Sequence, residues 1–96
     1  MKLSIIVPCY NESKNIPLIL ERFDAVIKEN GIEVILVNNG SHDNSQEVLD
    51  NLVPRYPFAR VVKVKENLGY GFGITSGLVE AKGNFIGYTH ADMQTD

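Results

Sequence analysis

The chain alternates between short apolar runs and longer segments in which apolar residues recur at helical spacing. The apolar runs span residues 3–7, 33–38, 60–65 and 84–89. The first two are almost unbroken in isoleucine, valine and leucine, which is typical of strands that are buried on both faces of a parallel sheet. The pattern therefore predicts four β-strands.

The interval after the first run predicts a helix. Its apolar positions follow three- and four-residue steps, at Ile16, Ile19, Leu20, Phe23 and Ile27. Pro17 falls in the first turn of this helix, where a missing N–H costs little. Gly31 is expected to end the helix.

Two further helices are predicted in the later intervals. Asp43 is a candidate N-cap of the second helix, with Gln46 three residues later. The buried face of that helix consists of Val48, Leu49 and Leu52. The third helix is expected over residues 71–81 and is ended by Gly83. Strand and helix thus alternate along the chain, which predicts an α/β fold: a Rossmann-like three-layer sandwich with a mainly parallel sheet.

Ligands of such folds bind at the carboxyl ends of the strands, so the segments after the strands form the candidate site. These segments read PCYNES (8–13), NNGSHDNS (38–45), ENLGYGFG (66–73) and HADMQTD (90–96). All four are rich in polar residues and glycine, which are common in turns. Turn formation alone does not require the aromatic residues or the carboxylates that these segments also contain.

Composition and charge narrow the classes of function. A chain of 96 residues forms one domain at most. Its net charge of -3 and pI near 5.3 give no electrostatic reason to expect a nucleic-acid partner. The chain has a single cysteine, Cys9, so no disulfide can form within it and a reducing, cytoplasmic location is expected. No apolar stretch approaches the ~18 residues of a membrane span, and the N-terminal run is too short for a signal peptide.

Two simple motif assignments fail. The glycines at 69, 71 and 73 suggest a dinucleotide-binding loop, but the sixth position of that fingerprint is Ile74 and the segment follows the third strand rather than the first. Cys9 as a nucleophile lacks a nearby Arg or His in the sequence, so a buried, inert thiol is expected.

The last segment presents candidate metal ligands. In an extended chain, His90, Asp92 and Gln94 lie on one side. Carboxylate and amide oxygens suit a hard divalent cation such as Mg²⁺ or Mn²⁺, and Mn²⁺ also accepts imidazole. The alternative is a solvated strand end followed by a helix cap at Thr95 or Asp96. Spacing alone does not separate the two interpretations.

Together the four segments resemble the N-terminal, nucleotide-binding half of family 2 glycosyltransferases with the GT-A fold. The residues that carry the resemblance are SIIVPCYNES, VNNGSHDNS, ENLGYGFGITSGLVEAKGNFIGY and HADMQ, in the order and approximate spacing of the family. The resemblance covers essentially the whole chain, and within the family it is strongest to the polyprenyl-phosphate mannose and glucose synthases.

The resemblance implies a nucleotide-binding role for each of the first two segments. Pro8, Tyr10 and Glu12 would border the base, with Tyr10 close to the ring and Glu12 in a polar contact. Asn38 and Asn39 occupy the place of two acids in the family, one of which contacts the uracil or guanine edge. An asparagine keeps an oxygen acceptor but loses the charge, so altered base preference is expected.

The resemblance also assigns the third and fourth segments. Asn67, Gly69 and Gly71 would shape the loop beside the nucleotide and its phosphates. The segment from His90 to Asp92 aligns with the Asp-x-Asp signature of the family, which adds His90 to the nucleotide-binding residues and makes Asp92 the ligand of a Mn²⁺ or Mg²⁺ that bridges the diphosphate. Gln94 would join the metal shell. His90 is a departure, because imidazole binds Mg²⁺ poorly and adds no negative charge.

The implied function is metal-assisted, inverting transfer of a sugar from a UDP- or GDP-linked donor to a polyprenyl phosphate or a glycan, as in the synthesis of cell-wall polysaccharides. The alternative is a degenerate module that binds nucleotide without turnover, suggested by the asparagines and His90.

In the family the acceptor half, with the usual catalytic base, lies C-terminal to the Asp-x-Asp segment. Residues 1–96 are therefore expected to be a truncated, inactive part, with no catalytic residue of their own. They are expected to self-associate through the surface that truncation uncovers. The full-length protein is expected at the inner face of the membrane.

Overall fold

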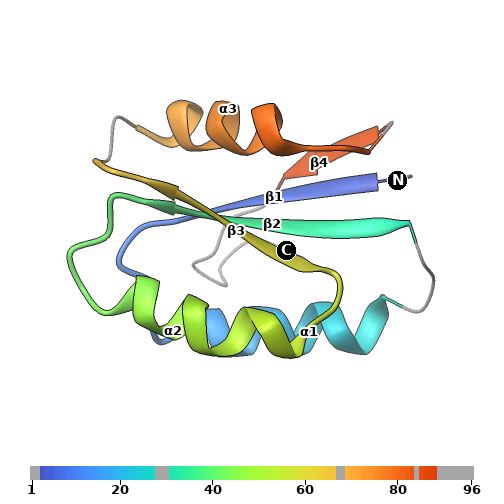
Figure 1. The fold of residues 1–96 in the computed structure, drawn as a ribbon, viewed down its shortest axis with the longest axis horizontal. Helices are drawn as coiled ribbons and strands as arrows, with labels where there is room; N and C mark the ends of the chain where they lie inside the picture. Colours follow the sequence, from blue (N-terminus) through green and yellow to red (C-terminus); the bar gives the residue numbers. More distant parts are fainter. Residues whose placement is uncertain (1–2, 28–30, 67–68, 84, 89–96) are drawn as a thin grey trace.

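A four-stranded parallel sheet forms the centre of the molecule, with helices on both faces (Figure 1). The computed structural model describes residues 3–27, 31–66, 69–83 and 85–88. The strands are β1 (Leu3–Cys9), β2 (Ile32–Asn39), β3 (Ala59–Val64) and β4 (Phe85–Tyr88). The helices are α1 (Ile16–Val26), α2 (Ser45–Leu52) with the 3-10 turn η1 (Val53–Arg55), and α3 (Tyr70–Glu80). The predicted three-layer α/β architecture is confirmed.

The strand order β3-β2-β1-β4 contains one reversal. From β1 the chain moves outward to β2 and then β3, with α1 and α2 on one face; α3 then returns across the opposite face to place β4 on the other side of β1 (Figure 1). Right-handed crossovers in opposite directions require helices on opposite faces. The order of the strands therefore reverses beside β1, and the carboxyl ends of β1 and its neighbours are where a ligand is expected.

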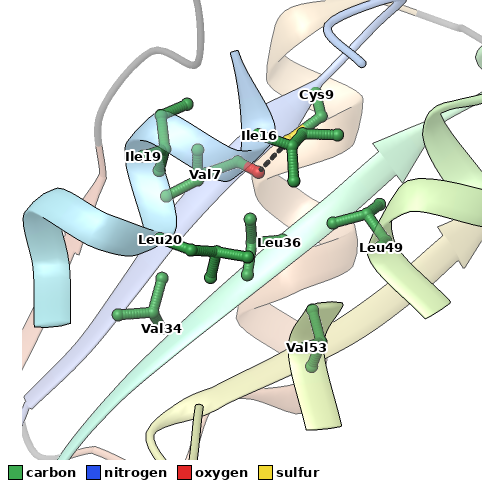
Figure 2. Close-up of a cluster of buried hydrophobic side chains, with 9 residues drawn as sticks. All are labelled: Val7, Cys9, Ile16, Ile19, Leu20, Val34, Leu36, Leu49 and Val53. Atoms are coloured by element: carbon green, nitrogen blue, oxygen red, sulfur yellow. Dashed lines mark hydrogen bonds between the residues drawn. The ribbon is translucent and has the colours of Figure 1, made fainter. Parts of the chain in front are cut away.

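The larger core lies between the sheet and the pair α1 and α2. Figure 2 shows side chains from α1, α2, η1 and the two central strands converging in this layer, all of them buried: Val7, Cys9, Ile16, Ile19, Leu20, Val34, Leu36, Leu49 and Val53. Val48 and Leu52 are partly buried against the same cluster, so the predicted inner face of α2 is confirmed. Alternate residues of the strands point the other way and form a smaller cluster under α3, made of Ile6, Ile35 and Val37.

Glycines bring α3 close to the sheet. A Cβ on Gly77 would lie 2.5 Å from Ile6 Cγ2, and a Cβ on Gly73 would lie 2.9 Å from Asn39 Nδ2. These two positions are one helical turn apart and leave no room for a side chain. The glycine-rich run that resembles a dinucleotide loop thus belongs partly to a helix that needs small residues for close packing.

A polar cluster that we call the amino-end clasp joins the α3–β4 connection to the amino ends of the other strands. It consists of Ser4, Glu33, Arg60, Lys82 and Gly83. The Glu33 carboxylate accepts hydrogen bonds from Ser4 Oγ at 2.6 Å, from the Lys82 backbone N–H at 2.8 Å and from Arg60 Nε at 3.0 Å. Ser4 Oγ in turn accepts from the Gly83 backbone N–H at 2.8 Å.

The strand bounds differ only slightly from the prediction, whereas the ends of the helices were predicted less well. Pro17 lies in the first turn of α1 as expected. The helix ends at Val26 with Ile27 as its C-cap in an extended conformation, so Gly31 does not end it. Gly31 instead has a φ of 93° directly before β2, and its carbonyl accepts a hydrogen bond from Leu3 N.

The proposed caps of the other two helices also need correction. The N-cap of α2 is Asn44 rather than Asp43, and Gln46 bonds to Asn38 and Asp50 instead of closing a capping box. Gly83 is not a left-handed helix terminator. A Cβ there would lie 2.6 Å from Ser4 N, so glycine is required by the close approach of the chain to β1. None of the helices in the described ranges is long and apolar enough to cross a membrane.

Candidate functional site

Two loops meet at the carboxyl end of the sheet, and we call them the braced loops: residues 10–15 after β1 and residues 40–44 after β2. Asn11 connects them. Its side-chain oxygen accepts hydrogen bonds from the backbone N–H groups of His42 at 2.8 Å and Asp43 at 3.3 Å, and its own N–H donates to Ser41 Oγ at 3.0 Å. Asn11 has a φ of 52°, a left-handed conformation that asparagine tolerates better than most residues.

The start of α2 continues this bracing. The hydroxyl of Ser45 accepts from the Glu12 N–H at 3.2 Å and donates to the Asp43 carboxylate. Asp43 also accepts from the backbone N–H groups of Ser45 at 2.9 Å and Ser13 at 3.4 Å. Burial alone would raise the pKa of Asp43, but the hydrogen bonds from Ser45 and Ser13 outweigh it and hold the pKa below its usual range. Asp43 therefore serves the loop and the first turn of α2, although it is not the N-cap.

In the first segment, Pro8 and Cys9 are buried and Tyr10 is exposed. Tyr10 is 42% exposed, and its ring meets the ring of exposed His42 edge to face, with centroids 6.2 Å apart and planes at 83°. Glu12 is half-buried and its carboxylate accepts from Asn15 Nδ2 at 3.3 Å. Tyr10 and Glu12 are thus held at the carboxyl end of β1, where the prediction placed them.

Cys9 is fully buried, and its Sγ donates a hydrogen bond to the Val7 carbonyl at 3.4 Å (Figure 2). Burial, and then the negative charge of Glu12, raise the pKa of the Cys9 thiol to about 12. The predicted burial of Cys9 is confirmed. A thiol with so high a pKa forms little thiolate, which agrees with the expectation of an inert residue.

The two asparagines at the end of β2 are each only 3% exposed. Asn38 accepts from the Ser41 N–H at 3.1 Å and donates to Gln46 Oε1 at 2.7 Å. Asn39 donates to the Gly69 carbonyl at 3.1 Å, which connects β2 to the segment before α3. Both contacts made through the amide nitrogen need a donor, and an ionised aspartate in either place has none.

Gly69 itself has a φ of 108°, a conformation that favours glycine. Its carbonyl also accepts from Gly73 N in α3, at 3.2 Å. The structure thus brings together Pro8, Tyr10, Glu12, Asn38, Asn39 and Gly69 at one end of the sheet, with Gly71 in the first turn of α3.

The remaining candidates, Asn67, His90, Asp92 and Gln94, lie outside the described residues. Within the described ranges, no group of three or more His, Cys, Asp and Glu side chains is arranged to hold a metal ion.

The bracing by Asn11, Ser41 and Ser45 was not foreseen from the sequence. The available signal was the density of small hydrogen-bonding residues in both PCYNES and NNGSHDNS. Such residues bond to backbone N–H groups in loops, but the sequence does not show that their partners lie about 30 residues away in the other loop.

Comparison with known proteins gives consistent matches. The sequence profile "Glycosyl transferase family 2" matches residues 4–96. An undecaprenyl-phosphate 4-deoxy-4-formamido-L-arabinose transferase of Yersinia enterocolitica is 36% identical, and the match covers 97% of this chain and 29% of that protein. A dolichyl-phosphate beta-glucosyltransferase of Trichomonas vaginalis is 31% identical, with 96% of this chain and 29% of that protein covered. The chain thus spans less than a third of the length of these relatives.

Solved structures show the same fold. S. aureus TarS in complex with UDP-GlcNAc superposes with a TM-score of 0.85 at 26% identity, covering 96% of this chain and 27% of that chain. The mannosyltransferase PcManGT from Pyrobaculum calidifontis, in complex with GDP-Man and Mn²⁺, superposes with a TM-score of 0.87 at 24% identity, covering 95% and 27%. The second likeness shows the fold alone. Because the family profile spans almost all of the residues, this chain belongs to glycosyltransferase family 2.

Proposed function

We propose that this chain forms the nucleotide-binding part of a glycosyltransferase that moves a sugar from a UDP- or GDP-linked donor to a polyprenyl phosphate or a glycan. The observation that carries the proposal is the position of the braced loops and Gly69 at the carboxyl ends of the strands, beside the reversal in strand order. The names of two relatives, which act on undecaprenyl phosphate and dolichyl phosphate, support the acceptor class. These acceptors are membrane lipids, so we place the reaction at the inner face of the membrane.

In this proposal Pro8, Tyr10 and Glu12 border the nucleobase. The exposure of Tyr10 at the carboxyl end of β1 supports this role, since the neighbouring Pro8 and Cys9 are buried. Asn39 contributes by holding the Gly69 backbone at the end of β2, beside the path that the phosphates would take. Preformed loops of this kind lower the entropy that ligand binding would otherwise cost.

We further propose that Asp92 and Gln94 hold a Mn²⁺ or Mg²⁺ ion. Carboxylate and amide oxygens fit either cation, and the imidazole of His90 fits Mn²⁺ better. When bound, the cation would stabilise the negative charge that develops on the departing diphosphate. Glucosyl-3-phosphoglycerate synthase from Mycobacterium tuberculosis has been solved with UDP and either cation, which supports the choice. The net charge of -3 also favours a donor whose phosphates are neutralised by a cation.

A second candidate function is nucleotide binding without turnover. The observation that favours it is the use of Asn38 and Asn39 within the protein, where their amide nitrogens donate to Gln46 and Gly69 in place of the acids of the family. The substitution His90→Asp separates the two. If the metal site is degenerate, this change strengthens Mn²⁺-dependent nucleotide binding at least severalfold; if the native site is competent, it leaves that binding little changed.

A thermal-shift titration tests the first proposal. The chain is heated with UDP, GDP or NAD, each with and without Mn²⁺. A ligand at a hundred times its dissociation constant stabilises the folded state by about 2.7 kcal/mol, which in a small domain raises Tm by on the order of 10 °C. We expect a Mn²⁺-dependent rise with UDP or GDP and none with NAD. A rise with NAD that needs no metal, or no rise with either diphosphate, would refute the proposal.

A further inference from the structure

Two exposed aromatic rings contact each other at the carboxyl end of the sheet, in the candidate site. Tyr10 comes from the loop after β1 and His42 from the loop after β2, and their rings meet edge to face at a centroid distance of 6.2 Å. Tyr10 is 42% exposed and His42 is exposed as well. The two rings come from different loops, and their exposed faces form a surface on which a flat ligand can stack.

The relative position of the two rings is set by one residue. Asn11 directly follows Tyr10, and its side-chain oxygen accepts the backbone N–H of His42 at 2.8 Å. The Asn11 N–H donates to Ser41, directly before His42, at 3.0 Å. Two hydrogen bonds through Asn11 therefore tie the backbone that carries Tyr10 to the backbone that carries His42. Such a surface needs little reordering when a ligand binds.

The geometry points to His42 as a second wall of the nucleobase site, with the base stacked against Tyr10 and bordered by the imidazole. A third ring fits a perpendicular pair because it can stack on one ring and meet the other at its edge. Imidazole also has one nitrogen that donates and one that accepts when neutral, so it can bond to the polar edge of a base. The inference rests on the proposed nucleotide-binding function and adds to it a residue from the NNGSHDNS segment.

The test compares ligands that have a base with one that lacks it. UDP, GDP and pyrophosphate are titrated, each with Mn²⁺, into the wild-type chain and into His42→Ala, His42→Phe and Asn51→Ala, and each Kd is measured by calorimetry. Asn51 is the control because it is exposed on α2, outside the braced loops. We expect His42→Ala to weaken the better-bound nucleotide about tenfold and to leave pyrophosphate unchanged. We expect His42→Phe to retain most of the affinity and Asn51→Ala to retain all of it.

The possible results distinguish a failure of the proposed role of His42 from a failure of the proposed nucleotide-binding function. Equal nucleotide affinity in wild type and His42→Ala would overturn the role of His42 and leave the nucleotide site standing. Failure of the wild-type chain to bind UDP, GDP and pyrophosphate would overturn the proposed function, and the inference with it. An equal loss for nucleotide and pyrophosphate would also overturn the inference, because it would show a general disturbance of the site rather than a lost base contact.

A second measurement follows the wild-type protein and uses a variant only to assign signals. The chain has two histidines, so the imidazole protons give two sets of NMR signals, and His42→Phe assigns them. We expect the His42 ring signals of the wild type to shift when UDP or GDP is added with Mg²⁺ and to stay in place with pyrophosphate. Unmoved His42 signals at saturating nucleotide would overturn the inference.

Discussion

Polar side chains connect segments of the chain at both ends of the sheet, but those at the amino end are centred on a buried residue and several of those at the carboxyl end are exposed. At the amino end, the clasp is centred on Glu33, which is 3% exposed and receives Ser4, Arg60 and the Lys82 backbone. At the carboxyl end, Asn11, His42 and Asp43 are exposed, and most of the bonds there run from backbone N–H groups to side chains.

The difference in burial decides what each end can do. A buried carboxylate that loses its partners, or partners that lose their carboxylate, cannot exchange the missing bonds for bonds to water. The clasp therefore stabilises the connection from α3 to β4 and tolerates little change. The exposed braces can be replaced by water at small cost. Substitutions near the braces should therefore alter ligand binding more than stability, and those in the clasp should do the reverse.

Removal of the clasp carboxylate should have the largest effect on stability. We expect Glu33→Ala to lower the free energy of unfolding by about 2–4 kcal/mol, because Ser4 Oγ and the Lys82 N–H lose a buried acceptor. Arg60 is partly exposed and adds less, since water can solvate it. Urea unfolding followed by circular dichroism measures the change. A loss no larger than that of an exposed substitution such as Asn44→Ala would remove the distinction between the two ends.

A methyl group added at Gly83, within the clasp, should have the second-largest effect on stability. A Cβ on Gly83 would lie 2.6 Å from Ser4 N and 2.8 Å from the Leu3 carbonyl carbon, which are backbone atoms that cannot turn aside. We expect Gly83→Ala to cost about 1–3 kcal/mol. Gly87 in β4 is the matched control, since a Cβ there meets nothing within 4 Å. Thermal unfolding of both variants provides the measurement, and similar Tm values for the two would contradict the close approach at Gly83.

At the carboxyl end, two substitutions of Asn11 separate the effect of backbone strain from the effect of the lost hydrogen bonds. We expect Asn11→Ala to cost about 1–2 kcal/mol, because alanine is disfavoured at a φ of 52°. Asn11→Gly relieves that strain and loses only the exposed braces, so it should cost no more than about 1 kcal/mol. Nucleotide affinity should fall in both, since the loops of Tyr10 and His42 are no longer tied. A glycine variant with unchanged affinity would show that the braces do not organise the site.

The smallest predicted effect is a difference in how the stability of the wild type and of two variants falls at acidic pH. Burial alone would raise the pKa of Glu33, but the hydrogen bonds from Ser4 and Lys82 and the charge of Arg60 outweigh it and lower the pKa. A glutamate of the unfolded chain has a pKa of about 4.3, so folding is stabilised above that pH and the gain is lost as pH falls through the lower pKa of the folded state.

The same sign holds for Asp43, whose pKa is also lowered, but its exposure to water weakens the effect. As pH falls below about 5, the urea midpoint should therefore decrease less steeply in Glu33→Gln than in the wild type, and Asp43→Asn should flatten this decrease less. A flatter curve for Asp43→Asn than for Glu33→Gln would reverse the assignment.

Much of this protein could be predicted from local pattern. Unbroken apolar runs identify the central strands because a strand covered by helices on both faces has no polar side. The three- and four-residue steps from Ile16 to Phe23 identify α1 for a similar reason, and the polar segments after the strands indicate where a ligand would bind. Local pattern predicted the helix ends and caps less well: α1 ends before an extended Ile27 and the N-cap of α2 is Asn44. Gly83 is required by the close approach of a distant part of the chain, at Ser4, which the local sequence does not show.

The sequence by itself determined the alternation of strands and helices, the buried state of Cys9 and the membership in the family, because each depends on residue type and spacing along the chain. Only the tertiary structure decided that Glu33 is the centre of a clasp, that Asn11 ties His42 to Tyr10, and that Asn39 holds Gly69. Those contacts join residues about 30 to 50 positions apart, and parallel pairing of the strands brings them within hydrogen-bond distance.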